Sequence, residues 1–171
     1  MRKEKYFDNT IFVFVGDHGI GGPVGDLYPK SWIEQHLDDE HVPLLFYSPK
    51  YIQPKKVTSV CSQIDILPSV ASVAKMPYNS RTLGRNLFDT TLLPDTYAFI
   101  MEHNENTIGV VNNKYYFVKN IVSGKEDFVS ITDNAKIFSN RYTDSVRTSL
   151  KNFTDAYYNT SKYLIVNNKK K

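Results

Sequence analysis

Residues 10–22 read Thr-Ile-Phe-Val-Phe-Val-Gly-Asp-His-Gly-Ile-Gly-Gly, an apolar run that ends in an acid, an imidazole and several glycines. Its six β-branched and aromatic residues carry no charge and predict a strand buried on both faces, which is typical of a mostly parallel sheet covered by helices. Ligands of open α/β sheets bind beyond the carboxyl ends of the strands, where Asp17 and His18 are expected. A carboxylate beside a neutral imidazole suits a divalent transition ion such as Zn²⁺ or Mn²⁺.

The same residues have a simpler interpretation as an ordinary turn. Asp17 could accept hydrogen bonds from nearby backbone amides, and Gly19 could adopt a positive φ angle. The residues alone leave both interpretations open, because short motifs of this kind often occur by chance.

Length and composition indicate an ordinary globular chain. The 171 residues make one domain or part of a larger one, with 41% hydrophobic and 23% charged residues. The net charge is +3, partly from the lysines at 169–171, and no basic face interleaved with aromatic residues points to nucleic acid.

The single cysteine, Cys61, cannot form an internal disulfide and is expected to be a small buried residue. No run approaches the roughly 18 apolar residues of a membrane span.

The pattern of elements divides the chain into residues 1–95 and 96–171. The first part is expected to form a mixed, mostly parallel sheet with flanking helices, and the second a small antiparallel β subdomain with a final helix, so the fold class is α/β. A compact domain rarely starts on a central strand, so the chain is interpreted as the carboxyl-terminal portion of a larger domain. The expected strands are 10–15, 43–48, 97–102, 107–111, 115–119 and 128–132, and the expected helices are 29–37, 63–74 and one capped by Asp144 that runs to Leu164.

Four motifs occur in a characteristic order. They are Gly16-Asp17-His18-Gly19, the strand His41-Val42-Pro43-Leu44-Leu45-Phe46-Tyr47, the helix start Ser62-Gln63-Ile64-Asp65-Ile66-Leu67-Pro68 and the loop Leu83-Gly84-Arg85-Asn86-Leu87. Together they resemble the carboxyl-terminal half of the alkaline phosphatase and sulfatase superfamily. Within it, the chain is similar to the lipoteichoic acid synthase-like and phosphoethanolamine transferase-like branch.

The resemblance implies that Asp17 and His18 hold a metal ion, Mn²⁺ or Zn²⁺, or Ca²⁺ if the protein is a sulfatase. The ion would activate a Thr, Ser or modified Cys nucleophile that forms a covalent intermediate. In the family, that nucleophile and a further acidic ligand belong to the amino-terminal half, so this chain contains no catalytic nucleophile. It also has no Cys-x-Pro-Ser-Arg sulfatase signature, because Cys61 is followed by Ser62-Gln63-Ile64.

The implied reaction moves a phosphoglycerol or phosphoethanolamine group from a phospholipid head group to an acceptor or to water. Two alternatives stay open: a sulfatase that hydrolyses sulfate esters, and a truncated, non-catalytic relative. The branch also implies a cell-membrane location, with the catalytic domain outside the cytoplasm and the membrane anchor outside this chain. The missing amino-terminal half of the domain is then the expected partner.

His41 lies at the start of the second strand, where some relatives hold Arg or His. Its imidazole could bind the substrate by donating a hydrogen bond to a phosphate oxygen, or it could ligate a second metal ion. A histidine at a strand start is more often a structural residue, so the functional and the structural roles stay open. His103 is interpreted as a loop residue.

Overall fold

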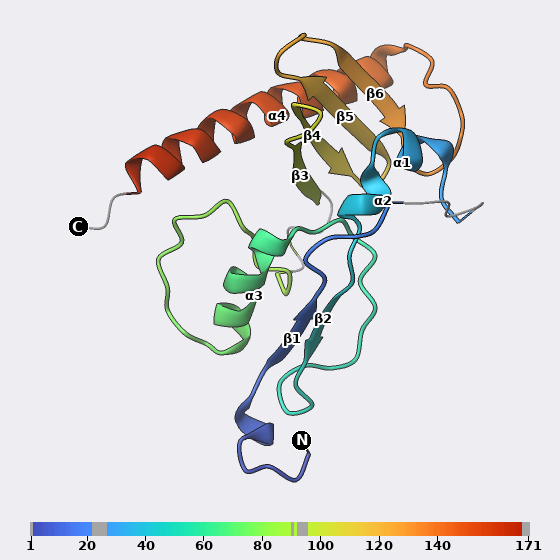
Figure 1. Ribbon diagram of the computed structural model, residues 1–171. Helices are drawn as coiled ribbons and strands as arrows, with labels where there is room; N and C mark the ends of the chain where they lie inside the picture. The colour runs from blue at the N-terminus through green and yellow to red at the C-terminus, as the bar shows by residue number, and fades with distance from the viewer. Residues whose placement is uncertain (1, 22–26, 90, 92–95, 169–171) are drawn as a thin grey trace.

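The computed structural model describes residues 2–21, 27–89, 91 and 96–168. Figure 1 shows a four-stranded sheet crossed by a long helix, and below it a two-stranded ribbon beside a shorter helix. The strands are β1 (Phe12–Val15), β2 (Leu44–Tyr47), β3 (Tyr97–Glu102), β4 (Thr107–Asn112), β5 (Tyr115–Asn120) and β6 (Glu126–Ser130). The helices are α1 (Lys30–Glu34), α2 (Leu37–Glu40), α3 (Ile66–Val73) and α4 (Arg141–Asn167), with 3-10 turns η1 (Phe7–Asn9) and η2 (Gln63–Asp65).

The larger sheet is antiparallel throughout, in the order β3-β4-β5-β6, so each strand pairs with the next one in the chain. Asn112 helps to turn β4 into β5, because its side-chain oxygen accepts hydrogen bonds from the backbone N–H groups of Lys114 (2.9 Å) and Tyr115 (2.8 Å). Asparagine side chains stabilise tight turns in this way. The prediction of a small antiparallel sheet followed by a helix is confirmed.

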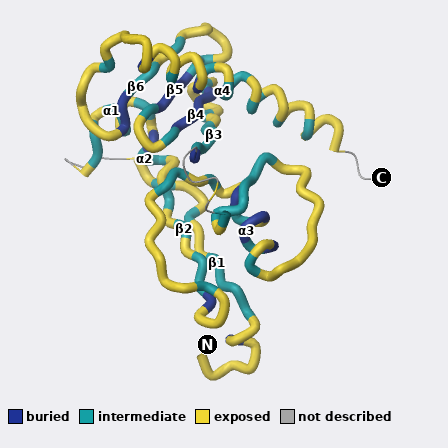
Figure 2. Tube along the Cα trace, turned by 180° about the vertical axis from the view of Figure 1, so that it is seen from behind, coloured by how far each residue is buried: buried dark blue, intermediate teal, exposed yellow. Residues whose placement is uncertain are grey.

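Both faces of this sheet are covered, and the main core lies here. On one face, α4 packs Leu150 against Val110 and Phe117, which are both fully buried. On the other face, Leu37 of α2 packs against Val111 and neighbouring residues of the sheet. Burying a side chain the size of Phe contributes about 1.5–3 kcal/mol. Figure 2 shows that the buried residues are concentrated in this sheet, whereas β1 and β2 are half-buried or exposed.

Helix α4 begins earlier than predicted. Its N-cap is Asn140, whose side-chain oxygen accepts hydrogen bonds from the backbone N–H groups of Tyr142 and Thr143. Asp144 lies inside the first turn and accepts a hydrogen bond from Ser139, so the prediction that it caps the helix is wrong. Asn140 and Asp144 are both good capping residues, and the sequence does not show which one the chain uses.

The prediction of a mostly parallel sheet is wrong for the described strands. β1 and β2 pair antiparallel, with Phe12 opposite Tyr47 and Phe14 opposite Leu45, and the described residues contain no parallel pair. An apolar run indicates burial but carries no information about the direction of the neighbouring strand. Even the burial is incomplete, because Phe14 is 53% exposed and Leu45 is 54% exposed. Cys61, expected to be buried, is also exposed.

Replacing Gly109 by alanine should destabilise the sheet. An added Cβ would lie 2.5 Å from the backbone oxygen of Phe117 and 2.7 Å from the hydroxyl oxygen of Tyr116. Both neighbours are buried in the core, and overpacking of this kind costs about 1–3 kcal/mol. Chemical denaturation should therefore show a lower midpoint for Gly109→Ala, and an unchanged midpoint would contradict the packing described here.

Candidate metal site

The Asp17-His18 turn leaves the ribbon directly at the end of β1. Gly16 donates a backbone hydrogen bond to the carbonyl of Pro43 (3.2 Å), and a Cβ on Gly16 would lie 2.8 Å from the Cβ of Val42. The glycine thus lets the two chains approach closely at this point. Asp17 and His18 follow at the carboxyl end of the strand, where the sequence places them.

The two side chains lie side by side. The backbone N–H of His18 donates to Oδ1 of Asp17 (3.1 Å), and the His18 ring places Nε2 3.8 Å from Oδ2 of Asp17. Nδ1 of His18 lies 2.7 Å from the carbonyl oxygen of Gly19, which can only accept a hydrogen bond. Nδ1 therefore carries the proton in the neutral ring, which leaves the lone pair of Nε2 free to bind an ion.

Both groups have shifted pKa values. The backbone N–H of His18 is the main cause that lowers the pKa of the Asp17 carboxyl, so this group stays ionised. The hydrogen bond to Gly19 is the main cause that raises the pKa of the His18 imidazole, followed by the charge of Asp17. Both side chains are largely exposed, which leaves them accessible to an ion and weakens their direct attraction.

Two more distant residues hold the turn in place. Gln63 of η2 donates from Nε2 to the carbonyl oxygens of Gly16 (2.7 Å) and Asp17 (3.1 Å). The carbonyl of Asp39, in α2, accepts a hydrogen bond from the backbone N–H of Gly19 (2.6 Å). Neither role was predicted from the sequence. Gly19 does not adopt the positive φ of the ordinary-turn interpretation, and among the described glycines only Gly124 does.

The donor chemistry fits part of a divalent-ion site. A separation of 3.8 Å is less than twice the metal–ligand distance of about 2.0–2.2 Å, so one ion could contact both Nε2 of His18 and Oδ2 of Asp17. Oδ1 of Asp39 is buried and makes no hydrogen bond with the described residues. No group of three or more His, Cys, Asp or Glu side chains with metal-binding geometry occurs in the described part of the chain, so a full coordination shell needs further ligands. Metal binding stays a prediction.

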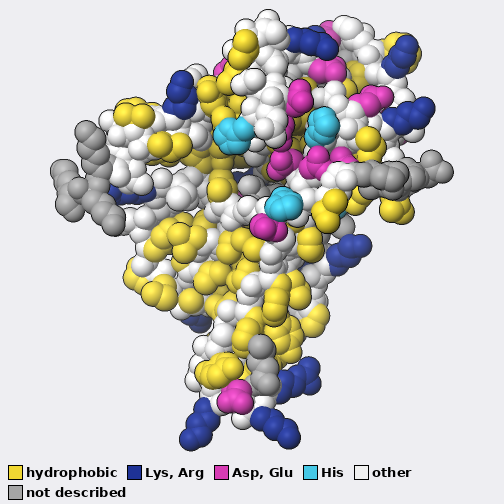
Figure 3. Space-filling model, in the orientation of Figure 1, with side chains coloured by type: hydrophobic (Ala, Val, Ile, Leu, Met, Phe, Trp, Pro, Cys, Tyr) yellow, Lys and Arg dark blue, Asp and Glu magenta, His cyan; other side chains and the backbone are white. Residues whose placement is uncertain are grey.

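His41 has well-defined neighbours. Its Nδ1 lies 3.2 Å from the hydroxyl of Tyr28, and its ring meets those of Tyr28 and Trp32 edge to face, with centroids 5.9 and 5.2 Å away. These contacts hold the imidazole in place, as a structural role or a substrate-binding role would require. Figure 3 shows histidine and acidic side chains gathered across the middle of this face, between the sheet and the ribbon. Substrate binding by His41 stays a prediction.

The two remaining motifs, at 62–68 and 83–87, meet in a buried ion pair. Asp65 is 1% exposed, and its Oδ2 lies 3.0 Å from Nη2 of Arg85. The same carboxylate accepts hydrogen bonds from the backbone N–H groups of Ser62 (2.9 Å) and Arg85 (2.7 Å). Arg85 also donates to the carbonyl of Tyr97 in β3. The pair therefore connects η2 and α3 with the larger sheet, and so supports Gln63 beside the candidate site.

Comparison with known proteins identifies the fold as sulfatase-like. Residues 1–76 match the sulfatase family. The structure is similar to that of BT1596, a 2-O GAG sulfatase, with a TM-score of 0.63 and 16% identity, covering 94% of this chain and 38% of that one. It is also similar to BT4656, solved in complex with its substrate D-glucosamine-2-N,6-O-disulfate, with a TM-score of 0.54 and 16% identity, covering 97% of this chain and 37% of that one.

In sequence, the chain is 30% identical over 105 residues to arylsulfatase K of Canis lupus familiaris. The match covers 60% of this chain and 18% of that relative, so the chain spans only a minor part of the proteins it resembles. These similarities support the resemblance to the superfamily at the level of sulfatases. The lipoteichoic acid synthase-like branch and the carboxyl-terminal position stay predictions.

Proposed function

We propose that the full-length protein containing this chain hydrolyses sulfate esters, and that Asp17 and His18 supply two ligands of its metal ion. The observation that carries the proposal is the position of the two residues. They lie side by side at the carboxyl end of β1, inside the stretch 1–76 that matches the sulfatase family. The ion would be Ca²⁺ for a sulfatase, and Mn²⁺ or Zn²⁺ for a phosphotransferase.

Each residue near the turn has a part in this proposal. A bound ion neutralises charge on the oxygens of the transferred group and lowers the pKa of a nucleophile. Asp17 would contribute a negative charge, and His18 would contribute the lone pair of Nε2, while the Gly19 carbonyl accepts a hydrogen bond from Nδ1–H. Gln63 fixes the backbone that carries both ligands. His41, oriented by Tyr28, is the candidate donor to an oxygen of the sulfate group.

Rates on a matched pair of substrates test the proposal. The full-length protein should hydrolyse 4-nitrophenyl sulfate faster than 4-nitrophenyl phosphate, and a chelator should abolish the activity until a divalent ion is added back. A preference for the phosphate ester would favour the phosphoglycerol or phosphoethanolamine transfer implied by the motifs. Absence of both activities would favour a truncated, non-catalytic relative.

The expected partner is the rest of a sulfatase-like domain. The cross-strand pair Phe14 and Leu45 exposes apolar surface on the ribbon, and Leu67 of α3 is 58% exposed. Figure 3 shows hydrophobic side chains clustered over this lower part of the molecule. Apolar surface and open strand edges of this kind usually pack against another segment.

The isolated chain should therefore associate with itself. We expect elution ahead of the monomer volume in gel filtration and binding of a dye specific for exposed apolar surface. Co-expression with the preceding part of the full-length protein should suppress both effects. A monodisperse monomer with cooperative unfolding and no dye binding would contradict this expectation.

Membrane association is proposed on the resemblance alone. The anchor would lie outside this chain, with the catalytic domain outside the cytoplasm. In the described part of the chain, no helix combines the length and the apolar character that a membrane span requires.

A further inference from the structure

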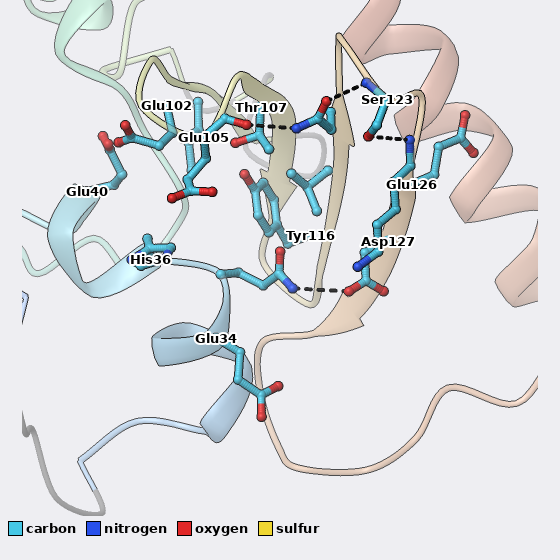
Figure 4. A pocket seen from close by; sticks show the side chains of 15 residues that line it. Glu34, His36, Glu40, Glu102, Glu105, Thr107, Tyr116, Ser123, Glu126 and Asp127 are labelled. Carbon is cyan, nitrogen blue, oxygen red and sulfur yellow. Dashed lines mark hydrogen bonds between the residues drawn. The ribbon is translucent and has the colours of Figure 1, made fainter.

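A groove of about 270 Å³ lies between the α1–α2 segment and the face of the larger sheet. Figure 4 shows its side chains converging from both sides, from the helices on one side and from strands β3 to β6 on the other. It is smaller than the roughly 300–1,000 Å³ of pockets for drug-sized ligands, so its size suits a small molecule. The lining residues used below are Glu34, Glu40, Ile100, Glu102, Glu105, Tyr116, Val118, Lys125, Glu126 and Asp127.

The groove concentrates negative charge in a chain whose net charge is +3. Its only lysine among the described lining residues is Lys125, beside two acids that already have partners. Glu126 pairs with Lys151 and with Arg147, and Figure 4 shows it turned towards α4. Asp127 accepts a hydrogen bond from Gln35 (3.1 Å).

At the opposite end of the groove, the acidic side chains have no such ion-pair partners. Glu34, Glu40 and Glu105 make no ion pair with the described residues, and Figure 4 shows Glu40, Glu102 and Glu105 on the same side of the groove. Burial is the main cause that raises the pKa of Glu40, and the charge of Glu102 adds to it. A cation placed among these carboxylates would remove that repulsion.

Tyr116 provides a second, independent indication of a ligand. Its side chain is only 2% exposed and lines the groove, with its hydroxyl held over Gly109. That hydroxyl makes no hydrogen bond with the described residues, and it is not among their fully buried polar atoms, so it is open to a partner in the groove. Burial raises the pKa of Tyr116, so the hydroxyl stays protonated and can both donate and accept. Figure 4 shows it among the carboxylates.

The chemistry of the groove points to an organic cation. No three of the described acids lie close enough to hold a single metal ion, so the charges are spread along the groove. Ile100 and Val118 add apolar surface between them. Methylene chains pack on such surface while their charged ends reach polar groups.

We propose that this groove binds a small linear polyamine, with its ammonium groups at Glu40, Glu102 and Glu105 and at the Tyr116 hydroxyl. The proposal concerns binding alone and does not depend on the proposed hydrolase function. A lysine-rich peptide is the competing ligand, but the small volume of the groove disfavours it.

Calorimetric titration of the full chain with spermidine at low ionic strength tests the proposal. One saturable site is expected, and butylamine, with a single ammonium group, should bind at least about tenfold more weakly than putrescine. Glu40→Gln should weaken spermidine binding by about tenfold or more, because it removes a charge and keeps the shape. Tyr116→Phe should weaken it by about threefold to tenfold while keeping the ring.

The matched control is Glu4→Gln, which removes the same charge from an exposed position outside the groove and should leave affinity unchanged. If Glu40→Gln does not fold, as judged by circular dichroism, Glu105→Gln supplies the same test from an exposed turn. The proposal is overturned by equal losses in the control and groove variants, by Mg²⁺ binding the site as tightly as spermidine, or by a site that takes oligolysine and not spermidine.

Discussion

Asp17→Asn should lower turnover of the full-length protein by more than about 100-fold, because loss of a residue that only supports a metal ligand already costs about 10–100-fold. The substitution keeps the size of the side chain and removes its charge. Metal affinity should fall together with turnover, since the other candidate ligand in this chain, Nε2 of His18, has no negative charge. Rates on an aryl sulfate and a competition titration with a chelator measure the two quantities. Unchanged values of both would mean that the turn is structural.

His41→Ala, unlike Asp17→Asn, should lower turnover without lowering metal affinity. It removes a candidate donor to the sulfate group but no metal ligand, so turnover should fall by about 10²- to 10³-fold, as for the loss of one oxyanion donor. Metal affinity should stay the same. Tyr28→Phe, which removes the hydroxyl 3.2 Å from Nδ1 of His41, should give a smaller loss in the same direction. His103→Ala in the exposed turn after β3 is the control and should change neither quantity.

Asp65→Ala should lower the free energy of unfolding by about 3–5 kcal/mol, the range for removing one partner of a buried ion pair. The substitution leaves the Arg85 guanidinium buried and without its partner, and it also leaves two backbone N–H groups unsatisfied. Denaturant unfolding of the full-length protein, followed by circular dichroism, measures the change.

Asp155→Ala is the matched control for this prediction. Its carboxylate lies 2.8 Å from Nζ of Lys119, but the pair is partly exposed, at 38% and 27% of the two side chains. Pairs near the surface contribute up to about 1 kcal/mol. Similar losses for Asp65→Ala and Asp155→Ala would show that burial does not set the energy of the Asp65–Arg85 pair.

The sequence predicts the elements of the larger sheet well, because local chemistry determines them. The strand predicted at 97–102 is β3 itself, and those at 107–111 and 115–119 end one residue early. Each is bounded by polar turns such as the one at Asn112. The strand predicted at 128–132 is observed at Glu126–Ser130. Strand direction in β1 and β2 could not be predicted, because an apolar run has the same appearance in parallel and antiparallel pairs.

In the candidate site, too, the contacts between chain neighbours could be predicted from the sequence, and the long-range contacts could not. Asp17 and His18 are adjacent in the chain, so their proximity follows from local geometry. Gln63 reaches the same turn from 47 residues away, and the tertiary fold alone determines that contact. Arg85 likewise meets Asp65 across 20 residues. The motifs singled out these stretches, but their residue types did not show which side chains would meet.

Anomalous diffraction from crystals of the full-length protein grown with the divalent ion that supports its turnover, Ca²⁺ if it is a sulfatase, tests the central claim most directly. We predict an anomalous peak about 2.0–2.6 Å from both Nε2 of His18 and a carboxylate oxygen of Asp17. The remaining ligands should come from outside the residues described here. A peak at another position, or no peak beside the Asp17-His18 turn under conditions that support turnover, would contradict the account.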